Sequence, residues 1–165
     1  MQMELPKRKP NRLPQYDYRT PNAYFITICT ANRKNLFWNV GAAIGRPEDI
    51  PLTPLGTTVW QQIADIPKHY PMISIDHFVV MPNHIHLLLQ IHTDPAGRPM
   101  AAPTISTVIN QTKGAISKKI GFSLWQKGFY DHVVRGEQDY LEIWNYIEGN
   151  PCKWAEDELC SPEIH

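Results

Sequence analysis

The stretch ISIDHFVVMPNHIHLLLQI, residues 73–91, decides the fold of this protein. It contains two runs rich in β-branched and apolar residues, and the brief turn between them holds Pro82 and Asn83. Two runs of this composition on either side of a short turn are typical of a β-hairpin. The sequence therefore predicts a pair of antiparallel strands near the middle of the chain.

The second run of the hairpin carries two histidines on one face. Side chains alternate along a strand, so His84 and His86 point to one side and Ile85 and Leu87 to the other. The apolar set is expected to face the core. The two histidines are then expected to lie as neighbours on the open face of a sheet.

The segments around the hairpin complete an alternating order of strands and helices. Residues 23–29 (AYFITIC) and 129–135 (FYDHVVR) are typical of strands. Helical periodicity predicts a helix that starts at Thr53-Pro54 and runs to Pro67, a second over 105–120 and a third around 140–147. The order β-α-β-β-α-β-α predicts an α+β fold. Its first six elements are those of a ferredoxin-like four-stranded antiparallel sheet with two helices on one face, and the third helix is expected to cover the other.

Length, cysteines and hydropathy bound the class of protein. A chain of 165 residues predicts one principal domain, here 21–158, with a basic arm at 1–20 and a short tail at 159–165. The three cysteines have no paired or metal-binding spacing, so a disulfide framework is not expected. No apolar run is long enough to span a membrane. These features predict a cytoplasmic protein with no membrane partner.

The net charge of zero conceals an uneven distribution along the chain. Residues 1–40 carry seven basic and two acidic side chains, whereas residues 137–165 carry one basic and eight acidic. Such asymmetry permits a basic nucleic-acid-binding face beside an acidic end, although a solvated mixed surface remains equally open. The candidate phosphate contacts are Arg8, Lys9, Arg12, Arg33 and Lys34. Lys113, Lys118 and Lys119 are expected on the solvated face of the second helix.

The chemistry-bearing residues lie on the hairpin and on the third helix. His84 and His86 have the separation that lets two imidazoles converge on one metal ion, although such pairs also occur as plain polar surface. Tyr146 and Asn150 are four residues apart on one helix flank. The phenol can serve as a nucleophile and the amide oxygen as a hard metal ligand. The alternative is that Tyr146 packs at the helix edge while Asn150, before Pro151, only ends the helix.

Other histidine and phosphate chemistries lack their motifs. Leu88 stands where a histidine-triad hydrolase requires a third histidine. Neither H-E-x-x-H, nor a phosphate-binding G-x-x-x-x-G-K-[ST] loop, nor a G-x-S-x-G elbow occurs. A two-histidine site on a sheet face with a tyrosine on a covering helix remains.

Four segments resemble a known family. IDHFVVMPNHIHLLL resembles the His-hydrophobe-His (HUH) motif of single-tyrosine transposases. LWQKGFYDHVVR, YLEIWNYIEGNPCKW and AYFITICTANRKNLF are similar to segments of the bacterial REP-associated tyrosine transposases, in the same order. The similarity runs from about residue 16 to about residue 158.

The resemblance implies roles for individual residues. It makes His84 and His86 metal ligands, Tyr146 the nucleophile and Asn150 the third ligand, where many relatives have Gln. It implies Mg²⁺ or Mn²⁺ as the cofactor and single-stranded DNA with REP-like hairpins as the partner of a monomer or homodimer. The implied activity is that of a DNA nicking and joining enzyme that forms a 5′-phosphotyrosine intermediate. Asp76, His77 and His132 are candidates for residues that support the site from outside.

Three alternatives remain open. A replication-initiator-like HUH nuclease also uses two histidines and a tyrosine, but commonly carries a lysine close after the tyrosine, where this chain has Asn150. A domesticated relative would bind hairpin DNA without cleaving it. An RNA-binding sheet module ranks last, because no aromatic platform for stacking bases is evident.

Overall fold

The computed structural model describes residues 22–39, 52–92 and 104–151, and a four-stranded antiparallel sheet lies at its centre. The strand order is β2-β3-β1-β4. The strands are β1 (Asn22–Cys29), β2 (Ile73–Val80), β3 (His84–Ile91) and β4 (Tyr130–Val133). The short 3-10 helix η1 (Ala31–Arg33) follows β1.

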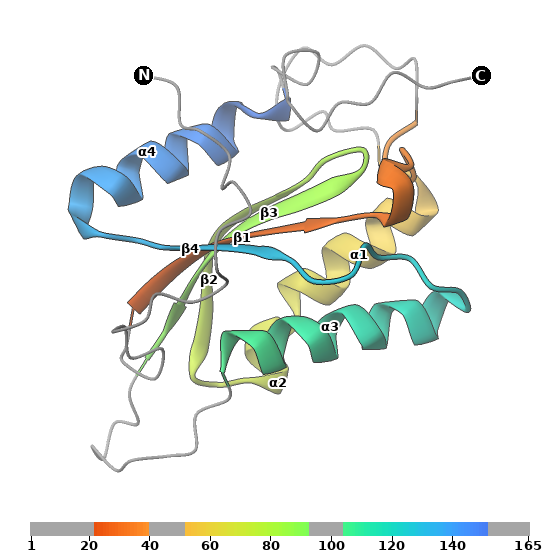
Figure 1. The fold of residues 1–165 in the computed structure, drawn as a ribbon, viewed down its shortest axis with the longest axis horizontal. Coiled ribbons are helices and arrows are strands. Elements are labelled where there is room, and N and C mark those ends of the chain that lie inside the picture. The colour runs from red at the N-terminus through yellow and green to blue at the C-terminus, as the bar shows by residue number, and fades with distance from the viewer. Residues whose placement is uncertain (1–21, 40–51, 93–103, 152–165) are drawn as a thin grey trace.

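Helices cover both faces of the sheet. α1 (Pro54–Ala64), α2 (Ile66–His69) and α3 (Ile105–Ile120) lie on one side, and α4 (Gly136–Gly149) lies on the other (Figure 1). This arrangement confirms the α+β fold predicted from the sequence, with the last helix covering the second face. The predicted bounds of the 1–20 arm and the 159–165 tail fall outside the described residues.

The first predicted helix is in fact two helices. The Thr53 side chain accepts a hydrogen bond of 3.0 Å from the Gly56 amide and caps α1, as the Thr-Pro start signal suggests. α1 ends at Ala64, and Pro67 lies in the first turn of α2. Proline has no N–H and its ring clashes with the carbonyl four residues earlier, so it ends one helix but fits the first turn of the next.

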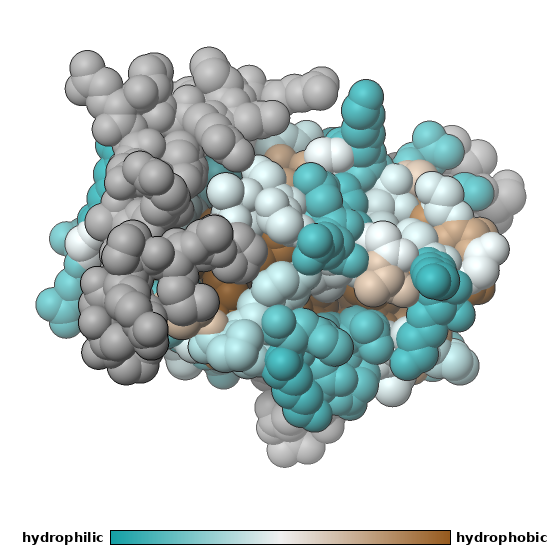
Figure 2. All heavy atoms as spheres, turned by 90° about the horizontal axis from the view of Figure 1, so that it is seen from below, coloured by the Kyte–Doolittle hydropathy of each residue, from teal (hydrophilic) through white to brown (hydrophobic). Residues whose placement is uncertain are grey.

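The core lies between the sheet and the three helices on its first face. Ile85 and Leu87 of β3 are fully buried, as are Ile63 of α1 and Val108 of α3. Each such side chain contributes roughly 1.5–3 kcal/mol of transfer free energy. Seen from below, on the side of these helices, hydrophilic side chains cover much of the visible described surface and apolar ones show between them (Figure 2).

Lys113 departs from its expected position on the solvated face of α3. The side chain is buried, and Nζ donates to the carbonyl oxygens of Gln126 and Gly128 at 3.0 and 2.6 Å. Burial lowers the pKa of this amine. Lys113 thereby links α3 to the segment before β4. An ammonium group has three hydrogens to donate, so it can bind both of these carbonyl oxygens, which lie outside the strands.

β4 and α4 differ from their predicted bounds. β4 is shorter than residues 129–135, whereas α4 begins at Gly136, four residues before the first apolar position that marked it. Among the described residues, no helix combines the length and apolar character of a membrane span.

Candidate functional site

Two histidines on β3 face each other through their outer ring nitrogens. The Nε2 atoms of His84 and His86 are 3.0 Å apart. Both side chains are fully buried, in contrast to their expected exposure on an open face. The cause is α4, which packs against β2 and β3 and covers this part of the sheet. The expected face is therefore right, and the expected exposure is wrong.

The inner ring nitrogens of the two histidines have protein partners. Nδ1 of His84 lies 2.7 Å from Asn83 Oδ1, and Nδ1 of His86 lies 2.9 Å from Thr27 Oγ1. Burial, and then the charge of His84, lower the pKa of His86 well below its ordinary value. A neutral imidazole whose Nδ1 is hydrogen-bonded presents Nε2 as a ligand, which is the usual arrangement at a metal centre.

Tyr146 of α4 lies against His86, one of this pair. Its ring centre is 5.2 Å from that of His86 and 6.0 Å from that of Phe25, in edge-to-face geometry in both cases. The side chain is only half-buried. The structure thus brings together a phenol from α4 and the two imidazoles from β3, as the resemblance implies.

Asn150 ends α4 with a buried side chain. Its Oδ1 has no hydrogen-bond partner among the described residues, and the residue is 4% exposed. Its backbone is helical, with φ −60° and ψ −43°, although Pro151 follows. An amide oxygen buried without a partner is costly unless something outside the protein binds it.

The candidate metal ligands are two imidazoles and one amide oxygen. In the part of the chain that the structure describes, no group of three or more His, Cys, Asp or Glu side chains is placed to hold a metal. A cation held by the two imidazoles and the Asn150 amide oxygen would have coordination positions left for water and phosphate oxygens. The amide oxygen is of the kind that Mg²⁺ and Mn²⁺ prefer, whereas imidazole is a ligand more typical of the later transition metals.

Asp76 lies at a bulge in β2 and contacts α4 rather than the histidines. The register of β2 against β3 shifts between Ile75 and His77. Asp76 Oδ2 accepts hydrogen bonds from the Tyr140 hydroxyl at 2.6 Å and from Gln90 Nε2 at 2.5 Å. Burial, and then the bond to Asp76, raise the pKa of Tyr140 to about 12. Asp76 thereby fixes the first half of α4 over the sheet.

His77 contacts the last turns of α4. Its Nε2 lies 2.6 Å from Glu148 Oε2, and its ring centre is 4.4 Å from the Trp144 ring. These contacts secure the helix on either side of Tyr146. His77 therefore helps to position α4, and neither of these contacts is with a candidate ligand.

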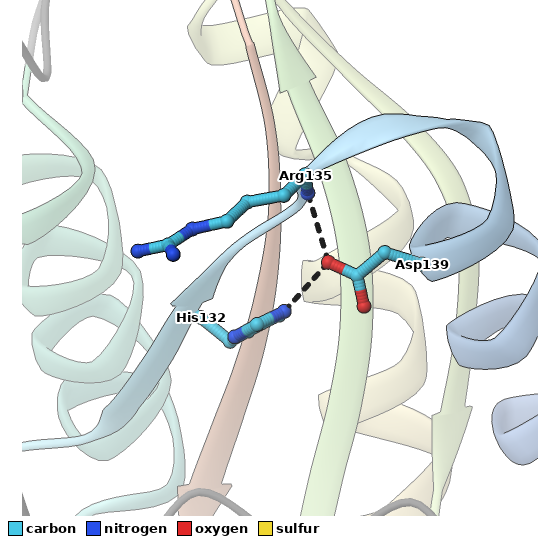
Figure 3. Close-up of polar contacts among 3 residues, drawn as sticks. All are labelled: His132, Arg135 and Asp139. Atoms are coloured by element: carbon cyan, nitrogen blue, oxygen red, sulfur yellow. Dashed lines mark hydrogen bonds and ion pairs between the residues drawn. The ribbon is translucent and has the colours of Figure 1, made fainter.

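His132 joins β4 to the start of α4. Its Nε2 lies 2.8 Å from Asp139 Oδ2, the same oxygen that accepts the Arg135 backbone N–H at 2.8 Å, whereas the Arg135 side chain extends away from the carboxylate (Figure 3). The carboxylate satisfies an amide that the first turn of α4 leaves without a helical partner. His132 therefore orders the start of the tyrosine helix.

The described basic candidates lie in the turn beside His84. Arg33 has a positive φ of 53°, and its carbonyl oxygen accepts a hydrogen bond of 3.3 Å from Asn83 Nδ2. The carbonyl of the neighbouring Lys34 accepts one from Thr30 Oγ1 at 2.9 Å. The backbone of Arg33 thus contacts Asn83, the residue before His84, and Lys34 follows in the same turn. Arg8, Lys9 and Arg12 lie outside the described residues.

Sequence reasoning missed the two residues that hold the histidines. Asn83 immediately precedes the motif, and its sequence context indicates only a turn residue. Thr27 is the cross-strand partner of His86, a relation that depends on the register between β1 and β3. The position of Asn83 beside a candidate ligand was a usable signal. Nothing in the sequence fixed the register that selects Thr27.

Comparisons with known proteins give relatives in one bacterium. No family model matches the chain. An uncharacterized protein of Haemophilus influenzae is 32% identical over 92% of this chain and 92% of its own length. A second protein of that organism, described as a putative REP-associated tyrosine transposase, is 23% identical over 52% of this chain and 53% of its own length.

A solved structure shares the fold. It is described as a REP-associated tyrosine transposase bound to a REP hairpin, and its TM-score is 0.60 at 22% sequence identity. The match covers 83% of this chain and 70% of that one. Together with the weaker sequence match, this fold confirms the resemblance seen in the sequence motifs.

Proposed function

Because this chain belongs to one family with the full-length Haemophilus relative and resembles the REP-associated tyrosine transposases in sequence and fold, we propose that it cleaves and rejoins single-stranded DNA. The substrate is a strand next to a hairpin. The reaction uses Tyr146 and a divalent cation, Mg²⁺ or Mn²⁺. The REP hairpin bound to the solved neighbour supports this class of substrate.

One observation carries the proposal: a half-buried tyrosine lies against one of two histidines whose Nε2 atoms face each other. The Tyr146 oxygen attacks a backbone phosphorus and forms a phosphotyrosine bond at a 5′-phosphate. The bond from phosphorus to the 3′-oxygen breaks. The phenol loses its proton, and the 3′-oxygen gains one to become a free hydroxyl.

The candidate ligands are His84 and His86 through Nε2, and Asn150 through Oδ1. The bound cation supplies positive charge that polarises the phosphoryl oxygen and stabilises the transition state. Burial lowers the pKa of His86 and keeps this imidazole neutral and available as a ligand. The protein–DNA bond retains the energy of the broken linkage, so attack by a 3′-hydroxyl can rejoin strands without a nucleotide cofactor.

The direct test is a cleavage assay on a single strand with a hairpin. The strand is labelled at its 3′ end, because that fragment stays joined to the protein through its 5′-phosphate. With Mn²⁺ we expect a labelled protein band on a denaturing gel. Chelation, His84→Ala and Tyr146→Phe should each abolish the band, and fully paired duplex DNA should be a poor substrate.

Two outcomes would reject the proposal. A wild-type protein that binds the hairpin but forms no adduct in Mg²⁺ or Mn²⁺ would be a hairpin-binding protein without cleavage activity. An adduct that forms at the wild-type rate in chelator would remove the cation from the mechanism. Tyr130→Phe is the matched control, since Tyr130 is on β4 and not on the helix that covers the histidines.

A further inference from the structure

The hydrogen bonds around the two histidines constrain the tautomer of one ring but not that of the other. The Asn83 amide is fixed in one orientation, because its Nδ2 donates to the Arg33 carbonyl, which can only accept. Its Oδ1, which can only accept, is the atom 2.7 Å from His84 Nδ1. His84 must therefore carry its proton on Nδ1, which leaves a lone pair on Nε2.

The partner of His86 imposes no such choice. The Thr27 hydroxyl lies 2.9 Å from His86 Nδ1 and can either donate or accept a hydrogen bond. The two Nε2 atoms are 3.0 Å apart, a distance at which one of them must carry a proton when only protein is present. Since Nε2 of His84 is a lone pair, that proton lies on Nε2 of His86.

We propose that Asn83 is a positioning residue that fixes His84 as the Nδ1–H tautomer, while Thr27 allows His86 to change tautomer. Without a cation, His86 donates from Nε2 to His84 and accepts from Thr27. When both Nε2 atoms become ligands, the His86 proton moves to Nδ1 and the Thr27 hydroxyl accepts from it. No proton is gained or lost. The second half of the inference rests on the proposed function, whereas the first concerns the protein alone.

Asn83 also joins the ligand to the basic turn. One amide bonds both to the carbonyl of Arg33 and to the ring of His84. The turn is further held by the Thr30 N–H, which donates to the Asn83 carbonyl at 2.9 Å. A change of Asn83 to Asp keeps the acceptor for His84 but loses the donor to Arg33. This variant distinguishes the effect of the bond to His84 from that of the bond to Arg33.

The tautomers are read by nitrogen-15 NMR of the histidine rings in protein free of divalent ions. We expect Nδ1–H for His84 and Nε2–H for His86 in the wild type. Asn83→Ala should move His84 toward Nε2–H, Asn83→Asp should keep Nδ1–H, and the matched control Asn110→Ala, exposed on α3, should change neither. An Nε2–H form of His84 in the wild type would overturn the proposal even if Asn83→Ala fails to fold. So would an unchanged tautomer in a folded Asn83→Ala.

Titration with Mg²⁺ separately tests the proposed change of the His86 tautomer. We expect His86 to change to Nδ1–H as Mg²⁺ binds, and Asn83→Ala to weaken Mg²⁺ binding by about 10–100-fold. Binding that leaves His86 as Nε2–H would overturn the change of tautomer. A wild type that binds no Mg²⁺ or Mn²⁺ and forms no adduct would instead reject the proposed function, while the ion-free spectrum still decides the role of Asn83.

Discussion

The Tyr140 hydroxyl donates a hydrogen bond of 2.6 Å to Asp76 Oδ2, which ties α4 to the bulge in β2. This contact separates the two tyrosines of α4. A phenol bonded to a carboxylate holds its proton, and its pKa is raised to about 12. Tyr140 is thus a poor nucleophile, whereas Tyr146 lies against His86.

We predict that Tyr140→Phe retains the covalent DNA adduct and loses stability, by about 1 kcal/mol for the hydrogen bond. The folded protein keeps the phenol neutral at pH values where the unfolded chain ionises it. The contribution of the bond is therefore present below about pH 10 and is lost as the pH rises toward 12. Denaturant unfolding of both proteins from about pH 8 upward measures the difference, which should shrink with alkalinity. An adduct absent from Tyr140→Phe but present in Tyr146→Phe would reverse the assignment.

The basic turn yields a prediction about salt. Replacing Arg33 and Lys34 with Ala should weaken binding to single-stranded DNA and flatten its dependence on salt. Two lost phosphate contacts correspond to a change of about 1.4 in the slope of log K against log salt. The matched control is the double replacement of Lys118 and Lys119, which removes the same charge from the last turn of α3. Fluorescence anisotropy over a series of salt concentrations measures both slopes, and equal losses would refute a specific role for the turn.

The order of elements was predictable because it depends on local signals. Alternation in residues 84–91 and the turn at Pro82-Asn83 identified the hairpin, and the apolar period of 105–120 identified α3. The break at Asp65 was missed because Ile66 continues the apolar period of α1 while belonging to α2. Lys113 was misplaced because its partners are carbonyls of a segment that periodicity does not describe.

The sequence predicted the positions of candidate site residues within one strand or helix, but not the contacts between different elements. Alternation placed His84 and His86 on one face, and helical spacing placed Tyr146 beside Asn150. Their burial depends on how closely α4 packs on the sheet, which follows from contacts between distant residues such as His77 and Glu148. The partners of Asp76 and His132 likewise lie on α4 and have no local signal in the sequence.

Two glycines in helices should respond oppositely to the same change. A Cβ at Gly56 would lie 2.2 Å from the Phe37 backbone oxygen, whereas a Cβ at Gly114 would meet no atom within 4 Å. We predict that Gly56→Ala destabilises the protein by about 1–3 kcal/mol, because backbone must shift at the start of α1. Gly114→Ala should stabilise it by up to about 1 kcal/mol through helix propensity. Urea unfolding of the two variants provides the comparison, and a stable Gly56→Ala would show that this contact can relax.

The last prediction concerns whether one chain completes its own site. A terminal helix can be exchanged between two copies of a chain. Here Tyr146 lies against His86 of the same chain, and β4 and α4 are joined through only Val134 and Arg135. Asp139 further fastens the start of α4 to β4 through His132 and the Arg135 amide (Figure 3). These contacts favour assembly within one chain.

Two inactive variants, His86→Ala and Tyr146→Phe, test this when they are mixed. If each site is built from one chain, the first variant lacks a ligand, the second lacks the nucleophile, and no mixture forms a DNA adduct. If helices are exchanged, a mixed dimer combines an intact histidine pair with an intact tyrosine, and the adduct returns. The assay is run after joint unfolding and refolding, so that slow exchange between preformed dimers does not hide complementation. Wild-type protein refolded in parallel controls for recovery, and an adduct in the mixture alone would place α4 of one chain over the sheet of another.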